Sequence, residues 1–125
     1  MSIFFSSDLH FNHVNLFENY GRSKFFSSVE DMNETIIANH NSVVSEDDTV
    51  YFLGDMVMGR RAESLPLIAE MNGVKHLVMG NHDYWDGGLP VLQPVFQAGV
   101  TLLQNAYYSF ERQNDQFLIA GLDNV

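Results

Sequence analysis

Short apolar runs alternate along the chain with stretches in which apolar residues have helical spacing. Short apolar runs that end in polar residues predict buried strands at residues 3–7, 49–53 and 74–79. Apolar side chains at helical spacing predict two helices between these strands, over residues 28–42 and 62–71. Because strands and helices that alternate in this way form parallel sheets, the pattern predicts an α/β fold.

Local signals indicate where the two helices begin and end. Ser27 is followed three residues later by Glu30, which fits a capping box at the start of the first helix. Pro66 lies inside the second helical pattern and favours a start near Ser64, because proline lacks the amide hydrogen that a helix interior uses. The Asn-Gly pair at 72–73 predicts the end of that helix.

The last part of the chain predicts β structure. A fourth strand is predicted at residues 100–103. Two further apolar runs, at residues 106–111 and 116–120, flank the turn-forming residues 112–115 and predict a β-hairpin. Because no linker or shift in composition divides the chain, we expect a single domain over residues 1–125.

Residues with metal-binding side chains follow each of the first three predicted strands, in the motifs DLH, GD and GNHD. They are Asp8, His10, Asp55, Asn81, His82 and Asp83. Alternate residues of an extended segment point the same way, so Asp8 and His10 can meet one ion. Open α/β sheets bind ligands at the carboxyl ends of their strands. The three motifs together therefore predict a metal site at that edge of the sheet.

The donor types narrow the metal and indicate a chemistry. Mixed nitrogen and oxygen donors suit manganese, iron, zinc or nickel rather than calcium. A carboxylate such as that of Asp55 can bridge two cations, and two metals about 3.5–4 Å apart can clamp a phosphate and activate a water. His82 can then protonate a leaving group, and Asp83 can fix the tautomer of that histidine. This combination predicts phosphoester hydrolysis.

Composition and charge exclude several other classes. The chain has 16 acidic and 6 basic residues, for a net charge of −10, which disfavours binding to nucleic acid or to an anionic membrane. It has no cysteine, so disulfides and thiolate sites are excluded. The N-terminus lacks the pattern of a signal peptide, and no apolar stretch is long enough to span a membrane. We therefore expect a cytoplasmic protein.

The motifs SDLHFNH, YFLGD and MGNHD resemble those of the calcineurin-like metallophosphoesterase superfamily, in particular its small bacterial and phage phosphoesterases. The resemblance covers roughly residues 3–83. It implies an α/β/β/α sandwich, of which this chain would be the N-terminal portion, and a site for two divalent transition-metal ions, manganese first. Asp8 and His10 would bind one metal, Asp55 would bridge both, and Asn81 would bind the second.

The resemblance also implies roles toward the substrate. His82 would be the catalytic histidine beside the leaving group, with Asp83 as its partner. Asn81, His82 and His13 would contact the substrate. The expected reaction is attack of a metal-bound hydroxide on a small phosphodiester, with a cyclic nucleotide as one candidate. A phosphomonoester and a nucleic-acid phosphodiester remain as alternatives.

The sequence departs from the family after the third motif. The family completes its site with later histidines, whereas no histidine follows His82 here. We therefore expect the C-terminal part of the family fold to be missing. Neither His40 nor His76 is expected to replace the missing ligands, because His40 lies in the first helix and His76 in the third strand. We expect a capping or surface role for His40 and a core or edge role for His76.

Two further hypotheses follow from this departure. The chain could be a non-catalytic metal-binding or interaction module whose uncovered sheet recruits a partner or associates with a second copy. Alternatively, two chains could complete the sandwich between them. Turnover of a phosphoester by the chain separates an enzyme from a module.

Overall fold

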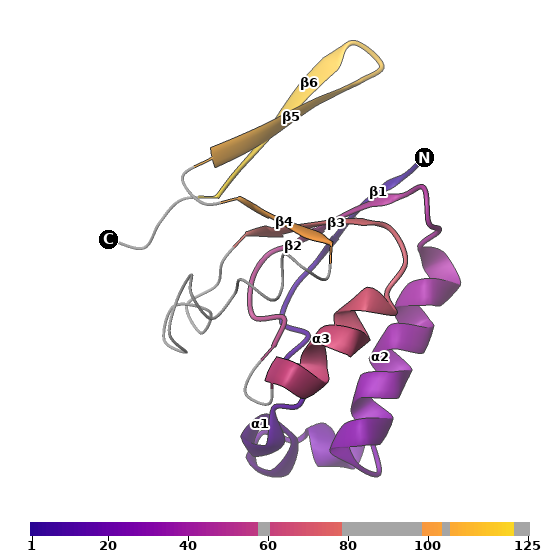
Figure 1. The fold of residues 1–125 in the computed structure, drawn as a ribbon, viewed down its shortest axis with the longest axis vertical. Helices are drawn as coiled ribbons and strands as arrows, with labels where there is room; N and C mark the ends of the chain where they lie inside the picture. The colour runs from indigo at the N-terminus through magenta and orange to yellow at the C-terminus, as the bar shows by residue number, and fades with distance from the viewer. Residues whose placement is uncertain (58–60, 79–98, 104–105, 122–125) are drawn as a thin grey trace.

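The computed structural model describes residues 1–57, 61–78, 99–103 and 106–121. At the centre is a four-stranded sheet whose strands lie side by side in chain order (Figure 1). All three neighbouring pairs are parallel, as the alternation of strands and helices predicted. The strands are β1 (Ile3–Ser6), β2 (Thr49–Phe52), β3 (Val74–Val78) and β4 (Val100–Leu103).

Two helices, α2 (Val29–Val43) and α3 (Arg61–Ala69), lie against one face of the sheet (Figure 1). Between β1 and α2 the chain also forms a short helix, α1 (Val14–Asn19), and a 3-10 turn, η1 (Arg22–Lys24). These two elements were not predicted from the sequence, because six and three residues are too few to show a helical period. Within the described ranges, none of the helices combines the length and the apolar character needed to cross a membrane.

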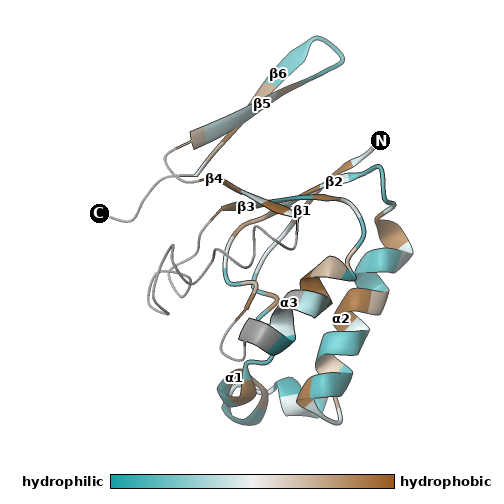
Figure 2. Ribbon diagram, in the orientation of Figure 1, coloured by the Kyte–Doolittle hydropathy of each residue, from teal (hydrophilic) through white to brown (hydrophobic). Residues whose placement is uncertain are grey.

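The hydrophobic core lies between the sheet and the two long helices. Because side chains alternate along a strand, the register of β2 and β3 puts Val50, Phe52 and Leu77 on the same face. These side chains are buried together with Ile37 of α2 and Ile68 of α3. Hydrophobic and hydrophilic residues are interleaved along α2, as an amphipathic helix requires (Figure 2). Burial of each such side chain contributes roughly 1.5–3 kcal/mol, which keeps the helices docked.

The opposite face of the sheet is aromatic and faces the hairpin formed by β5 (Ala106–Arg112) and β6 (Asp115–Gly121) (Figure 1). The rings of Tyr51 and His76 stack with their centroids 4.9 Å apart. The ring of Tyr108, from β5, lies 4.8 Å from that of His76. The predicted α/β fold with a C-terminal hairpin is therefore confirmed.

The start of α2 differs from the prediction by one residue. Its N-cap is Ser28, whose hydroxyl oxygen accepts from the amide of Asp31 at 3.0 Å. The carboxylate of Asp31 in turn accepts from the amide of Ser27 at 2.9 Å. Because the N-cap is Ser28 and not Ser27, the third helical residue is Asp31 and not Glu30. The Asp31 carboxylate accepts from the amide of Ser27, the residue before the N-cap, whereas a capping box uses the amide of the N-cap residue itself, so the predicted capping box is only half matched.

The start of α3 also differs from the prediction. The helix begins at Arg61 rather than near Ser64, and Pro66 lies inside it. A proline at this position removes one amide donor, while its carbonyl oxygen still accepts from the amide of Glu70 at 3.2 Å. One lost hydrogen bond is not enough to delay the start of a helix whose buried face packs on the sheet.

Candidate metal centre

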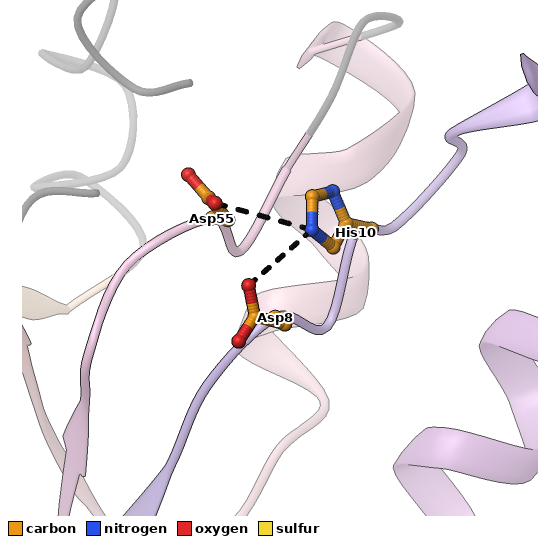
Figure 3. Close-up of side chains that lie close together, drawn as sticks. All are labelled: Asp8, His10 and Asp55. Carbon is orange, nitrogen blue, oxygen red and sulfur yellow. Dashed lines mark ion pairs between the residues drawn. The ribbon is translucent and has the colours of Figure 1, made fainter. Parts of the chain in front are cut away.

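Side chains from two loops converge at the carboxyl ends of β1 and β2 (Figure 3). Nε2 of His10 lies 3.5 Å from Oδ1 of Asp8 and 4.0 Å from Oδ2 of Asp55. One ligand atom from each of the three residues lies within 4.8 Å of the other two. The structure thus brings together three of the residues that the sequence analysis placed at this edge.

Main-chain hydrogen bonds join the two loops directly. The amide of Asp8 donates to the carbonyl oxygen of Gly54 at 3.3 Å, and that of His10 to the carbonyl oxygen of Asp55 at 3.0 Å. One residue further on, the amide of Phe11 donates to the carbonyl oxygen of Met56 at 3.0 Å. The pairing of β1 with β2 therefore continues past the strands, and it fixes how the side chains of the two loops face each other.

The backbone at the cluster is left-handed. Asp8, His10 and Asp55 have φ values of 55°, 51° and 53°, in a region that residues other than glycine rarely occupy. The expectation that Asp8 and His10 meet because they alternate along an extended segment is therefore wrong. They meet because the loop turns through left-handed conformations. Each such residue costs on the order of 1–3 kcal/mol, and strain of this kind gathers at functional sites.

The distances from His10 to the two carboxylates are those of donors that share one cation. Metal–nitrogen and metal–oxygen bonds of about 2.0–2.2 Å place two donors of one ion at most about 4.4 Å apart. Both separations from His10 Nε2, 3.5 Å and 4.0 Å, fall within that limit. One imidazole nitrogen with two carboxylate oxygens suits a first-row transition metal better than calcium.

Burial differs within the cluster. The side chains of His10 and Asp55 are 7% and 9% exposed, whereas that of Asp8 is 64% exposed. A buried carboxylate is costly unless charge or hydrogen bonds compensate it, and a bound cation would contribute to that compensation. The exposed Asp8 leaves the cluster open to solvent on one side, so a ligand can reach it.

Arg22, from η1, binds the main chain of the loop that follows β1. Its guanidinium donates to the main-chain carbonyl oxygens of Asp8 and Leu9, each at 2.9 Å. Burial lowers the pKa of Arg22 from its ordinary value, and the charge of the nearby Asp8 opposes that shift. Because an arginine keeps its proton at any ordinary pH, the two hydrogen bonds persist across the physiological range.

A buried polar network anchors the far end of the same loop. The side chain of Asn12 donates to the hydroxyl oxygen of Ser64 at 2.6 Å. Asn12 and Asn33 form a reciprocal pair: the Asn33 amide group donates to the Asn12 side-chain oxygen at 2.8 Å, and the Asn12 main-chain amide donates to Asn33 Oδ1 at 3.2 Å. All three residues are buried, so the network ties the loop to both α2 and α3.

Roles for Arg22, Asn33 and Ser64 at the site were not predicted from the sequence. Asn33 did leave a signal, because it lies four residues from both Val29 and Ile37 on the buried stripe of α2. A polar residue on such a stripe indicates a buried hydrogen-bonding partner. Arg22 left no comparable signal, since its partners are main-chain carbonyl groups.

His13 lies against His10. The two Nδ1 atoms are 3.1 Å apart, and the ring centroids are 5.1 Å apart with a 34° tilt. The structure therefore places His13 beside the predicted metal ligands, and its predicted contact with substrate stays a prediction. The remaining predicted site residues, Asn81, His82 and Asp83, lie outside the residues that the structure describes.

The two histidines judged to be structural lie away from the cluster. His40 uses Nε2 to bond the main-chain carbonyl oxygen of Asn72 at 2.9 Å, so it ties α2 to the segment after α3. His76 is buried between Tyr51 and Tyr108, and burial lowers its pKa from the ordinary value. Their structural interpretation is therefore consistent with where they lie.

An α/β sheet that carries carboxylate and imidazole donors at its carboxyl edge has the layout of an α/β metalloenzyme. A family model for calcineurin-like phosphoesterases matches residues 1–124 of the chain. The chain therefore belongs to the calcineurin-like phosphoesterase family, as its three motifs predicted.

The chain is similar to three known proteins. An uncharacterized protein of Methanocaldococcus jannaschii is 42% identical over 83 residues, which cover 65% of this chain and 46% of that protein. The gene 66 protein of Mycobacterium phage L5 is 38% identical over 82 residues, which cover 63% of this chain and 38% of that protein. The chain thus spans less than half the length of the curated relatives it matches. The crystal structure of a protein of unknown function from Aquifex aeolicus shares the fold, with a TM-score of 0.63 and 24% identity over 96% of this chain and 60% of that one.

Proposed function

We propose that the chain carries the metal-binding residues of a metal-dependent phosphoesterase. The convergence of Asp8, His10 and Asp55 at one sheet edge is the observation that carries the proposal. Membership of the calcineurin-like phosphoesterase family supports it independently. The strained backbone of the loop and the buried hydrogen bonds that hold it support the proposal further, because strained conformations are typically found at functional sites.

The proposed cofactor is a pair of divalent transition-metal ions, with manganese first. Such ions supply positive charge toward a phosphate and activate a water. Asp8 and His10 would hold one ion, Asp55 would reach both through its two oxygens, and Asn81 would hold the second. This arrangement explains how a chain with a net charge of −10 can take an anionic substrate.

The proposed substrate is a small phosphodiester, with a cyclic nucleotide as one candidate. His82 would donate a proton to the leaving oxygen, and Asp83 would orient the ring of that histidine. Asn81 would lie on the substrate side. The net charge of −10 disfavours a long nucleic acid as the substrate, and the proposed location is the cytoplasm.

A second candidate function is a binding module without turnover. Its specific support is the apolar surface of the hairpin, where Tyr107 and Leu118 are 67% and 62% exposed. Exposed apolar patches mark interaction surfaces when they are contiguous. On this proposal the chain binds metal and self-associates through the hairpin. Sedimentation over a range of concentrations tests it, with Leu118→Asp expected to shift the chain toward monomer.

Hydrolysis of bis(p-nitrophenyl) phosphate tests the enzyme proposal. The chain is assayed with and without Mn²⁺, beside p-nitrophenyl phosphate and a cyclic nucleotide to separate diesters from monoesters. We expect Mn²⁺-dependent turnover that Asp55→Asn abolishes. Asp47→Asn makes the same chemical change at an exposed turn and is expected to keep activity.

The outcomes separate the two candidates. Turnover that needs Asp55 excludes a purely binding role. A folded wild-type chain that binds Mn²⁺ yet turns over none of the three substrates favours the module. Activity that survives Asp55→Asn would count against the proposed site itself.

A further inference from the structure

The pairing of His13 with His10 is fixed by the main chain and not only by their side chains. The amide of His13 donates to the carbonyl oxygen of His10 at 3.1 Å, which closes a tight turn. The carbonyl oxygen of His13 then accepts from the amide of Phe17 at 3.1 Å in the first turn of α1. Both ends of His13 are therefore held, and its ring is set 5.1 Å from that of His10.

Two nitrogens at hydrogen-bonding distance share one hydrogen. The Nδ1 atoms of His10 and His13 are 3.1 Å apart, so in a hydrogen bond between neutral rings one donates and the other accepts. The opposite nitrogen of His10, Nε2, faces Asp8 and Asp55. A nitrogen that ligates a cation must present its lone pair, and its ring then carries the hydrogen on Nδ1.

We infer that His13 is a positioning residue, which accepts a hydrogen bond from Nδ1–H of His10 and so keeps the Nε2 lone pair of His10 directed at the carboxylate pair. The inference rests on the proposed function, because it assigns a partner to one of the proposed metal ligands. A neutral His13 that accepts at Nδ1 carries its own hydrogen on Nε2. This role acts through His10 and requires no contact between His13 and a substrate.

The burial of His10 makes metal affinity sensitive to the loss of the hydrogen-bond acceptor for its Nδ1–H. The His10 side chain is only 7% exposed, so water replaces a lost partner less readily than at the surface. Hydrogen-bond partners of metal-ligating histidines fix the tautomer and ring orientation, and their loss typically costs about 10–100-fold in metal affinity. We expect an effect of that size from removing the acceptor of His13.

Two substitutions test the inference on the full chain. His13→Phe keeps a planar ring but removes the acceptor, whereas His13→Asn keeps an acceptor oxygen near the position of Nδ1. Calorimetric titration with Mn²⁺ is expected to show affinity about 10–100-fold weaker for His13→Phe and within about threefold of wild type for His13→Asn. Circular dichroism and thermal melting show whether each variant is folded.

A second measurement needs no variant. Zn²⁺ is diamagnetic, so nitrogen-15 NMR of the Zn²⁺-loaded wild-type chain reports directly which nitrogen of His10 carries the hydrogen. We expect a protonated Nδ1 and a Zn²⁺-bound Nε2. A hydrogen on Nε2 would overturn the inference even if His13→Phe failed to fold.

The remaining outcomes distinguish failure of the role inferred for His13 from failure of the proposed metal-dependent function. Unchanged Mn²⁺ affinity in a folded His13→Phe chain, with a raised KM, assigns His13 to the substrate and overturns the inference alone. A folded wild-type chain that binds neither Mn²⁺ nor Zn²⁺ overturns the proposed function itself.

Discussion

The main-chain amide of His10 donates to the main-chain carbonyl oxygen of Asp55 at 3.0 Å, so two residues of the candidate metal centre are joined before any ion is considered. They come from the loops that follow β1 and β2, 45 positions apart in the sequence. Because the link uses only main-chain atoms, it survives substitution of either side chain. The geometry of the centre and its charge can therefore be tested separately.

Asp55→Asn is expected to abolish metal-induced stabilisation while leaving the fold intact. A ligand that binds only the native state stabilises it by about 2.7 kcal/mol at 100 times its Kd. We expect Mn²⁺ to raise the melting temperature of the wild-type chain and of Asp47→Asn, but not that of Asp55→Asn. Differential scanning fluorimetry across a Mn²⁺ series measures the shift. An equal shift in Asp55→Asn would mean that the ion binds elsewhere.

Arg22→Gln is expected to lower both stability and metal affinity. The substitution removes the guanidinium that spans the carbonyl oxygens of Asp8 and Leu9, and hydrogen bonds from a charged donor contribute about 1.5–3 kcal/mol each. Because Arg22 is partly exposed, water replaces some of the lost hydrogen bonding. We therefore expect the free energy of unfolding, measured with urea, to fall by about 1–3 kcal/mol.

Lys24→Gln provides the matched control for Arg22. It removes a positive charge from the same 3-10 turn, at an exposed position. We expect little change in its urea midpoint or its Mn²⁺ affinity. If Lys24→Gln loses as much stability and Mn²⁺ affinity as Arg22→Gln, the loss of a positive charge explains both effects, and the two hydrogen bonds of Arg22 to the loop do not.

The sheet and the approximate position of the site were predictable from the sequence. The backbone conformations and hydrogen bonds that fix the loop of the site were not. Apolar runs identified the strands, and parallel strands necessarily bring their carboxyl ends to one edge, which placed Asp8 and Asp55 together. The left-handed conformations of Asp8 and His10 could not be located from residue type, because aspartate and histidine adopt such conformations more often than most residues but occur mainly outside them. The bond between Asn12 and Ser64 spans 52 positions, and nothing local to either residue indicates the other.

Asn33→Ala is expected to destabilise the chain more than the same change elsewhere on α2. It leaves the side-chain oxygen and the main-chain amide of Asn12 without their partner in a buried site. An unsatisfied buried polar group costs about 1–3 kcal/mol. Asn39→Ala makes the identical substitution on the exposed side of the same helix, so differences in helix propensity cancel. Urea unfolding of the pair gives the comparison, and equal midpoints would show that the network contributes nothing.

Asp48 is expected to make the stability of the chain depend on pH. The amides of Ser45 and Ser2 donate to its carboxylate at 2.8 Å and 2.6 Å, and these bonds lower the pKa of Asp48 from its ordinary value. Its main-chain carbonyl oxygen also accepts from the amide of Val74 at 2.7 Å, so Asp48 lies where the starts of β1, β2 and β3 meet.

Because the folded pKa of Asp48 lies below the unfolded one, its carboxylate stabilises the fold above the unfolded value of about 3.9. That contribution is lost as the pH falls through the folded pKa. Asp48→Asn is therefore expected to be less stable than wild type at pH 7, with a gap that closes below about pH 4. Urea unfolding from pH 7 to pH 3 follows the gap. Asp47→Asn, whose side chain is exposed, is expected to show no comparable closing, and a gap for Asp48→Asn that stayed constant with pH would contradict the assigned role of the carboxylate.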